Sequence, residues 1–344
     1  SLPVGDVGPI TIESTVVDLI KDFVQIDDDG LLCIKSEGDM MSMSAYRVAT
    51  LFEDADVVNT WMPGGQSASV AGMGSMLSFM GFRFPGQKIT LTADNPLWKA
   101  VPVELTADVN SLDMSTFSMA WNESKEVSTT LGRSAKNVVL CEFEAPSGMS
   151  TIVSGLSVSG LKYSLPERIA NSVANEDNNN FRLSYTYVTN VSPGSSLELN
   201  DLTLPDIKNI NVPLAQYTIH SCRATCDIVN TLPFDITLDS LKVLVPNPDA
   251  EEEDDELMVD ERIQITGGIK IAGGSPDQPA TSPVEVTIAA TDGIVPDISG
   301  LRATVSIKVS EGLGDTILSA RQGISAKNIK ATVSGGVTIP DLSK

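Results

Sequence analysis

The chain has 344 residues, of which 42% are hydrophobic, and its 23 basic and 45 acidic residues give a net charge of -22. This length suits about two domains, and the hydrophobic fraction is large enough to bury a sizeable core. An acidic surface repels phosphate backbones and anionic membranes, so nucleic acid is excluded as an expected partner. No apolar run approaches the roughly 18 residues of a membrane span, so we expect no transmembrane segment.

Two segments in the N-terminal part of the chain show helical periodicity. In residues 14–24, STVVDLIKDFV, apolar residues recur three or four positions apart after Ser14, a residue type that caps helix N-termini. In residues 166–174, PERIANSVA, Pro166 would occupy the first turn, where proline is tolerated. We therefore expect one or two short helices, near 14–24 and 166–174.

Period-two alternation of apolar and polar residues is the strongest pattern elsewhere. Such runs, rich in β-branched residues and bounded by Gly, Pro, Asn and Asp, are typical of half-buried strands. They follow one another without helical segments between them, which excludes a βαβ architecture and predicts an all-β protein of antiparallel β-sandwich domains, Ig-like or similar. The runs are 89–93, 101–109, 181–188, 263–271, 284–290, 303–309 and 331–339.

The domain division is marked by polar or proline-containing breaks. EDNNN (176–180) is a polar break, and NVPLAQ (211–216) precedes a long strand-like run. We expect a C-terminal β-sandwich domain over 215–344, and a mostly β region over 1–214 that forms one or two domains.

Residues 220–245 carry a strand pattern that continues through a proline. Apolar residues fall on even positions up to Leu238, although Pro233 interrupts the run and proline is normally kept out of central strands. One strand from 220 to 238 would be about 60 Å long, far beyond the usual five or six residues. The segment 230–233 is therefore predicted to be a corner between two sheets, and a change of parity predicts a bulge near Asp239 and Ser240.

The segment HSCRATC (220–226) contains the only histidine and two of the four cysteines. In a strand, His220, Cys222 and Cys226 share one face, but the two cysteines lie about 13 Å apart, too far for a disulfide with each other or for one zinc ion. Cys33 and Cys141 also lie in apolar runs. We expect four core cysteines, no metal and no cofactor; a metal site and a disulfide between separate strands stay open as alternatives.

Two acidic stretches raise the question of calcium. Residues 249–261 carry nine acids between two strand-like runs, and we interpret them as a solvated hairpin loop, with calcium as the alternative. Residues 25–36, QIDDDGLLCIKS, resemble an EF-hand loop in Asp27, Asp29 and Gly30. Gln25 and Ser36 stand where such a loop needs acids, so a turn is the better interpretation.

The segment 62–86 combines glycine and methionine. Seven of the eleven methionines lie between Met40 and Met80, and Gly72-x-Gly74 lacks the third glycine of a dinucleotide fingerprint. Core strands joined by glycine turns are one interpretation. An apolar ligand groove or a partner-binding loop is another, with copper held by thioethers as a third. The candidate ligand contacts, with the tryptophans considered for stacking on sugar rings, are Met73, Met76, Met80, Trp61, Trp98 and Trp121.

Catalytic patterns are scarce. With one histidine in the chain, on a predicted core face, a Ser-His-Asp or Cys-His site is not expected, and neither a GxSxG nor a Walker motif is present. A carboxylate pair for glycoside hydrolysis could be formed from the 45 acids, so a glycosidase stays as a remote alternative. We expect a protein that is not an enzyme.

Two resemblances add to this interpretation. NTLPFDITLDSLKV (230–243) resembles the Asn-x-x-Pro-Phe step of LEA14-type β-sandwich domains. VGPITIESTVVDLIKDF near the N-terminus, with a Ser/Thr-rich all-β body and few cysteines, is similar to Bacteroides-type secreted surface lipoproteins, several of which are described as adhesins. The second likeness implies a cell-surface or periplasmic protein, with a lipid anchor upstream of Ser1 as an expectation.

Pattern and resemblance lead to one functional expectation and one alternative. We expect a non-catalytic, extracytoplasmic β-sandwich protein that serves as a cell-surface adhesion or structural module, with a protein or glycan partner. The alternative is a module that binds carbohydrate or an apolar ligand at the cell surface.

Overall fold

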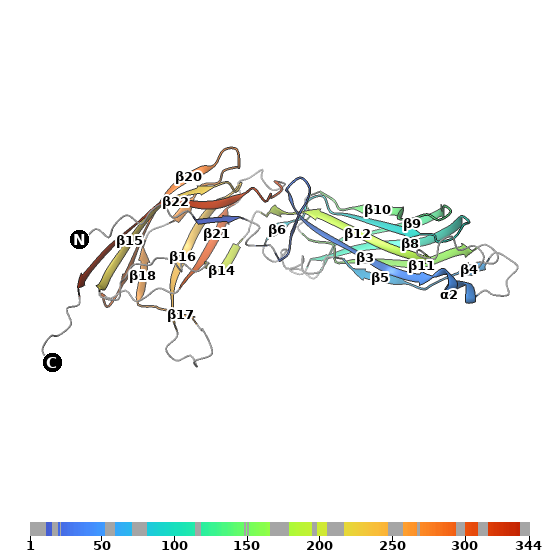
Figure 1. Cartoon of the computed structure of the whole chain (residues 1–344), viewed down its shortest axis with the longest axis horizontal. Helices are drawn as coiled ribbons and strands as arrows, with labels where there is room; N and C mark the ends of the chain where they lie inside the picture. Colours follow the sequence, from blue (N-terminus) through green and yellow to red (C-terminus); the bar gives the residue numbers. More distant parts are fainter. Residues whose placement is uncertain are drawn as a thin grey trace. The chain divides into compact units, whose positions relative to one another are not determined.

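The structure is a computed structural model in which antiparallel strands dominate (Figure 1). Among the described residues, helix is confined to Ile20 and the six-residue α2 (Ala45–Thr50). The expected all-β class with antiparallel, sandwich-like sheets is confirmed. The structure describes residues 12–15, 20, 22–51, 59–70, 81–113, 118–147, 149, 151–165, 179–194, 198–204, 217–246, 257–266, 269–293, 300–308 and 316–337.

The chain divides into two compact units. We call residues 20–193 the inserted unit, and residues 1–19 together with 194–344 the split unit. Strand β1 (Ile12–Thr15) pairs with β22 (Gly323–Val337), and β14 (Glu198–Leu204) pairs with β21 (Gly300–Lys308). The division after residue 214 that the sequence suggested therefore differs from this one, because β1 and β14 both pair with strands of the C-terminal part.

In its described residues, the inserted unit consists of two five-stranded sheets and one short extra strand pair. Its strands are β2 (Gln25–Ile26), β3 (Leu32–Ser44), β4 (Asn59–Trp61), β5 (Gln66–Ser69), β6 (Phe82–Arg83), β7 (Lys88–Asp94), β8 (Val101–Asp113), β9 (Ser118–Leu131), β10 (Val138–Glu144), β11 (Gly155–Leu165), β12 (Asn180–Asn190) and β13 (Ser192–Pro193). One sheet has the order β10-β7-β12-β3-β2. The other has the order β4-β11-β8-β9, with β5 also on β11, and β6 pairs with β13.

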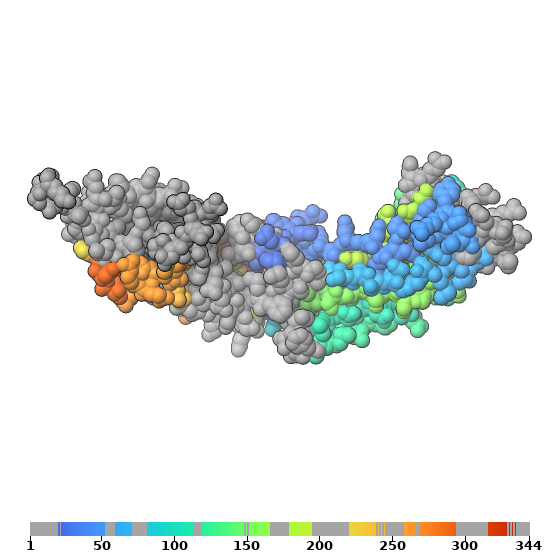
Figure 2. All heavy atoms as spheres, turned by 90° about the horizontal axis from the view of Figure 1, so that it is seen from below, coloured from blue at the N-terminus to red at the C-terminus, as the bar shows by residue number. Residues whose placement is uncertain are grey.

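The core of the inserted unit lies between its two sheets. Trp61 on β4 stacks on Tyr163 of β11, with ring centroids 5.1 Å apart, and both rings pack against Phe181 of β12 at 5.3 Å. Because β12 belongs to the other sheet, these rings join the two layers. In the space-filling view, residues 59–70 in light blue lie beside β11 in green (Figure 2), in agreement with their strand pairing.

The split unit has the same two-sheet construction. Its remaining strands are β15 (Tyr217–Asn230), β16 (Asp235–Pro246), β17 (Leu257–Val259), β18 (Ile263–Thr266), β19 (Ile269–Ile271) and β20 (Ala280–Ala290). The sheet orders are β1-β22-β15-β20-β18 and β14-β21-β16-β17, with β19 also on β16. Val284, Val286 and Ile288 alternate along β20 and form a core cluster with Cys222, Cys226 and Ile228, as the period-two pattern requires.

The two units repeat one strand topology. In the inserted unit β7 lies between β10 and β12, and β3 flanks β12; in the split unit β15 lies between β20 and β22, and β1 flanks β22. In the second sheets, β8 lies between β11 and β9 as β16 lies between β21 and the β17/β19 strands. The matching strands follow the same chain order. The chain therefore contains two copies of one sandwich, the first of which is inserted after the first strand of the second.

The proline-containing corner is confirmed. Strand β15 ends at Asn230 and β16 begins at Asp235, and the two strands belong to different sheets. Leu232 and Phe234 on either side of Pro233 are 3% and 4% exposed, so the corner keeps both flanks in the core. The predicted bulge is confirmed as well, because the register of β16 on β21 shifts between Leu238 and Ser240.

The predicted helices fall largely outside the described residues. Within 14–24, Ser14 and Thr15 belong to β1, Ile20 is helical, and residues 22–24 form a turn and irregular backbone. A helix that begins directly after Ser14 is therefore wrong, because the pairing of β1 with β22 holds Ser14 in a strand. The segment 166–174 lies outside the described part of the chain.

Candidate binding surface on the Trp98 loop pair

The three tryptophans have different environments. Trp61 and Trp121 are 5% and 7% exposed, so neither offers an open ring face for a ligand. Trp98 is 58% exposed and lies in the loop between β7 and β8. Of the three tryptophans considered for sugar stacking, Trp98 alone presents its side chain to solvent.

Trp98 lies on one of two adjoining loops, residues 95–100 and 132–137, which we call the Trp98 loop pair. Asn95, which is fully buried, organises the first loop: its Oδ1 accepts a hydrogen bond from the Leu97 amide at 3.0 Å. Its Nδ2 donates to the Lys99 carbonyl at 2.8 Å and to the carbonyl of Gly132 in the second loop at 2.7 Å. One side chain thus shapes the turn that carries Trp98 and ties it to the second loop.

Backbone hydrogen bonds also connect the two loops. The Ser134 amide donates to the Leu97 carbonyl at 2.8 Å, and the Asn95 amide donates to the Ala135 carbonyl at 2.9 Å. The Asn137 amide donates to Asp94 Oδ1 at 2.7 Å. These bonds hold Trp98 on a preorganised support, which lowers the entropy cost of binding.

Three cations share this surface. Lys99, Arg133 and Lys136 are all exposed, and neither loop contains an acidic residue. Among the residues that the structure describes, no ion pair involves any of the three. The two loops therefore carry three exposed positive charges, beside the buried carboxylate of Asp94, on a chain whose net charge is -22.

The split unit holds the counterpart of this loop pair at the corner of Pro233. Asn230 is fully buried there and repeats the bonds of Asn95: Oδ1 accepts from the Leu232 amide at 2.8 Å, and Nδ2 donates to the carbonyls of Phe234 at 3.1 Å and Ala272 at 3.0 Å. Pro233 occupies the position of Trp98, three residues after the asparagine. The counterpart loops, 230–235 and 272–279, contain no lysine or arginine. The scaffold thus forms without tryptophan or cations, which are specific to the inserted unit.

The asparagines and the cations were missed by the sequence reasoning. The two asparagines could have been found from an Asn-x-Leu sequence that occurs in both NPLWKA (95–100) and NTLPFD (230–235), each time at the end of an alternating run. The Gly/Met candidates Met73, Met76 and Met80, and most of the acidic run 249–261, lie outside the described residues.

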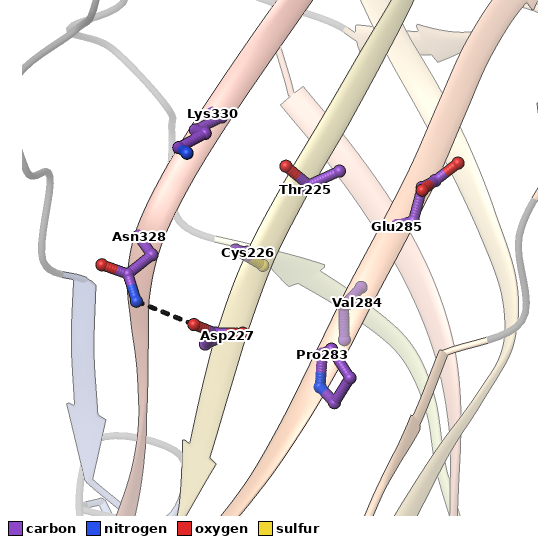
Figure 3. Close-up of a pocket in the computed structure, with 8 residues that line it drawn as sticks. All are labelled: Thr225, Cys226, Asp227, Pro283, Val284, Glu285, Asn328 and Lys330. Carbon is purple, nitrogen blue, oxygen red and sulfur yellow. Dashed lines mark hydrogen bonds between the residues drawn. The ribbon is translucent and has the colours of Figure 1, made fainter.

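An open hollow of about 430 Å³ on the split unit is a second surface feature (Figure 3). Thr225 and Asp227 of β15, Glu285 of β20, and Asn328 and Lys330 of β22 line it. Both lining carboxylates are already engaged, because Asn328 donates to Asp227 at 2.7 Å and Arg223 donates to Glu285 at 2.5 Å. We assign no function to this hollow.

His220 differs from the sequence-based expectation. Strand parity predicts that it lies on the core face, but the structure exposes it, and its Nδ1 lies within hydrogen-bond distance of the Gly293 carbonyl. The reason is a register shift between Ile219 and Ser221 in the pairing of β15 with β22, which leaves His220 as an extra residue at a bulge.

The four cysteines are free thiols, and none is fully exposed. Cys222 and Cys226 pack against the β20 cluster, as their shared strand face predicts. Among the described residues, no group of three or more His, Cys, Asp and Glu side chains is placed to hold a metal ion. Asp27 Oδ1 accepts hydrogen bonds from the amides of Asp29 and Leu31, so the stretch compared with an EF-hand forms a turn.

The thiols are expected to react slowly with alkylating agents. Burial raises the pKa of all four, that of Cys141 to about 11, and only the thiolate is nucleophilic. At pH 8, iodoacetamide should label the native protein much more slowly than free glutathione, and labelling of Cys141 should rise as the pH approaches 11. Denaturant should expose all four thiols. Labelling of the native protein at the glutathione rate would contradict this assignment.

Comparisons with known proteins identify no family. No family model matches the chain, and no curated protein does. Three solved chains match. One of them, from Parabacteroides distasonis, is described as a "putative secreted protein". Its sequence is 12% identical to this chain, and the two structures superpose with a TM-score of 0.43. The match covers 96% of this chain and 100% of the Parabacteroides chain. At that level the likeness carries no argument about function.

None of the helices in the described part of the chain is long and apolar enough to cross a membrane.

Proposed function

We propose that this protein is a non-catalytic binding module of the cell surface that attaches to carbohydrate through the Trp98 loop pair. The observation that carries the proposal is the exposure of Trp98, 58%, on loops that buried Asn95 fixes in place. Aromatic rings in preformed positions are suited to stacking on sugar rings, because they bury a large area at little entropy cost. The extracytoplasmic setting follows the resemblance to secreted surface lipoproteins, and an adhesion role would use the same surface.

The arrangement of the described ionisable groups supports a role without catalysis. The single histidine is exposed and lies beside the Gly293 carbonyl. Of the two carboxylates in the hollow, Glu285 has its pKa lowered by its hydrogen bond with Arg223. A glycosidase acid needs the opposite shift, because it must stay protonated near neutral pH.

Substitution of Trp98 by alanine tests the proposal. Wild-type protein and Trp98→Ala are compared on an array of neutral and acidic glycans, and hits are quantified by calorimetry. We expect the wild type to bind at least one class of glycan and Trp98→Ala to bind it about tenfold or more weakly, because a central aromatic contact dominates such interfaces. Thermal stability should change little, since Trp98 is exposed.

Met119→Ala is the matched control. Met119 is 62% exposed in the same unit, near the start of β9, whereas the second loop of the pair follows the end of that strand. This variant should bind like the wild type. An array on which the wild type binds no glycan, or equal binding by Trp98→Ala, would overturn the proposed function.

A further inference from the structure

We infer that the Trp98 loop pair recognises an acidic glycan, one that carries carboxylate or sulfate groups, and not a neutral one. This inference rests on the proposed function and adds the class of ligand. Lys99, Arg133 and Lys136 place three exposed positive charges on the two loops that hold Trp98, and no acid lies in either loop. An acidic sugar chain can stack one ring on Trp98 while its anionic groups meet these cations.

The three cations of the loop pair are available to a ligand. Some half-buried cations of this acidic protein are paired, since Lys88 binds Glu142 at 2.8 Å and Lys162 binds Glu104 at 3.1 Å. The three cations of the loop pair have no ion-pair partner among the described residues. They can bind a ligand's anions without first breaking an internal pair.

Comparison of the two copies of the sandwich gives independent support. The loops around Asn230 fold with the same hydrogen bonds but carry Pro233 in place of the tryptophan, and their one charged residue besides Asp235 is Asp277. The cations around Trp98 are therefore not required by the corner itself. Their presence in one copy, together with the exposed ring, is consistent with a binding role in that copy.

A sugar chain fits this surface better than a membrane does. A bilayer is an extended anionic plane that meets a whole face of a protein, and the net charge of -22 opposes its approach. A glycan contacts only the loops, and at physiological ionic strength charges beyond about 8 Å are largely screened. Trp98 is also the single large apolar side chain exposed on the Trp98 loop pair, whereas interfacial segments insert several.

The test uses the full chain and matched polysaccharide probes. Dextran and dextran sulfate share one backbone and differ in charge, and hyaluronan supplies carboxylates. We compare the wild type, Trp98→Ala, the triple variant Lys99→Gln/Arg133→Gln/Lys136→Gln, and the control Lys35→Gln/Arg47→Gln/Lys270→Gln. Both triple variants lower the net charge from -22 by three, to -25, and Lys35, Arg47 and Lys270 are exposed outside the loop pair.

We expect dextran sulfate or hyaluronan to bind the wild type and the control alike, and dextran to bind weakly. The loop-pair triple variant should lose about tenfold in affinity at low salt, and raising the salt should remove most of that difference. Trp98→Ala should lose binding at every salt concentration.

The outcomes separate the two proposals. Equal binding of dextran and dextran sulfate, both sensitive to Trp98→Ala, would overturn the acidic-glycan inference and leave the proposed function standing. Loss of binding in both triple variants alike would show a net-charge effect and overturn the inference. Binding to vesicles with 30% phosphatidylserine in place of any glycan would overturn both.

Discussion

Replacing Asn230 with alanine should lower the free energy of unfolding of the split unit by about 3 kcal/mol. The substitution leaves the Leu232 amide and the carbonyls of Phe234 and Ala272 without their partner, and each orphaned buried group costs about 1–3 kcal/mol. Asn230 is fully buried, so water cannot replace the lost bonds without opening the corner.

The measurement is denaturant unfolding followed by two probes. All three tryptophans lie in the inserted unit, so tryptophan fluorescence reports that unit while far-UV circular dichroism reports both. Asn230→Ala should shift the circular-dichroism transition and leave the fluorescence transition in place. Asn95→Ala should shift the fluorescence transition together with the inserted unit's share of the circular-dichroism change, and Asn122→Ala, at an exposed strand position, should shift neither transition. A decrease of less than 1 kcal/mol in the free energy of unfolding for Asn230→Ala would contradict the stabilising role assigned to its three hydrogen bonds.

Replacing Trp61 with alanine should destabilise the inserted unit by about 3–5 kcal/mol, the usual cost of removing a large buried aromatic side chain. The indole stacks on Tyr163 and packs on Phe181, so its loss leaves a cavity where the two sheets meet. The fluorescence-detected transition should move to lower denaturant for Trp61→Ala and stay near its wild-type position for Trp98→Ala. Equal stability of the two variants would contradict the environments described for these residues.

Much of the fold could be predicted from the sequence, because strand alternation reports burial directly. The runs at 89–93, 101–109, 181–188 and 284–290 all lie within strands, and parity located both the corner at Pro233 and the bulge near Asp239. The even–odd pattern of apolar residues does not predict which side chains are buried where a bulge shifts the strand pairing and no residue type in the sequence signals it. The bulge at His220 depends on how β22 pairs with β15, and a single strand's pattern does not contain that information.

The sequence did not predict the duplicated sandwich, and the reason is the strand topology. The inserted unit separates β1 from the rest of its own sheet, so one fold is split across the sequence. Sandwich topology also tolerates wide sequence change, provided that alternation is kept. What the copies visibly share is the buried asparagine with a leucine two residues later, in NPLWKA and NTLPFD, too short a match to reveal a repeat unaided.

The candidate site could be predicted only in part. All three tryptophans are candidates by sequence, because nothing in their local sequence separates exposed Trp98 from buried Trp61 and Trp121. The cations Arg133 and Lys136 reach the neighbourhood of Trp98 because β8 pairs with β9, with Val101 opposite Leu131. That long-range pairing, which no local pattern encodes, creates the surface.

The central claim, that the protein binds glycan through Trp98, is tested most directly by the indole signals of its three tryptophans. A ¹⁵N–¹H correlation spectrum should show three indole cross-peaks, and the Trp98 peak is identified by its absence in Trp98→Phe. On titration with hyaluronan or dextran sulfate, we predict that the Trp98 peak moves or broadens while the Trp61 and Trp121 peaks stay in place. Saturable binding that leaves the Trp98 peak unmoved would contradict the claim.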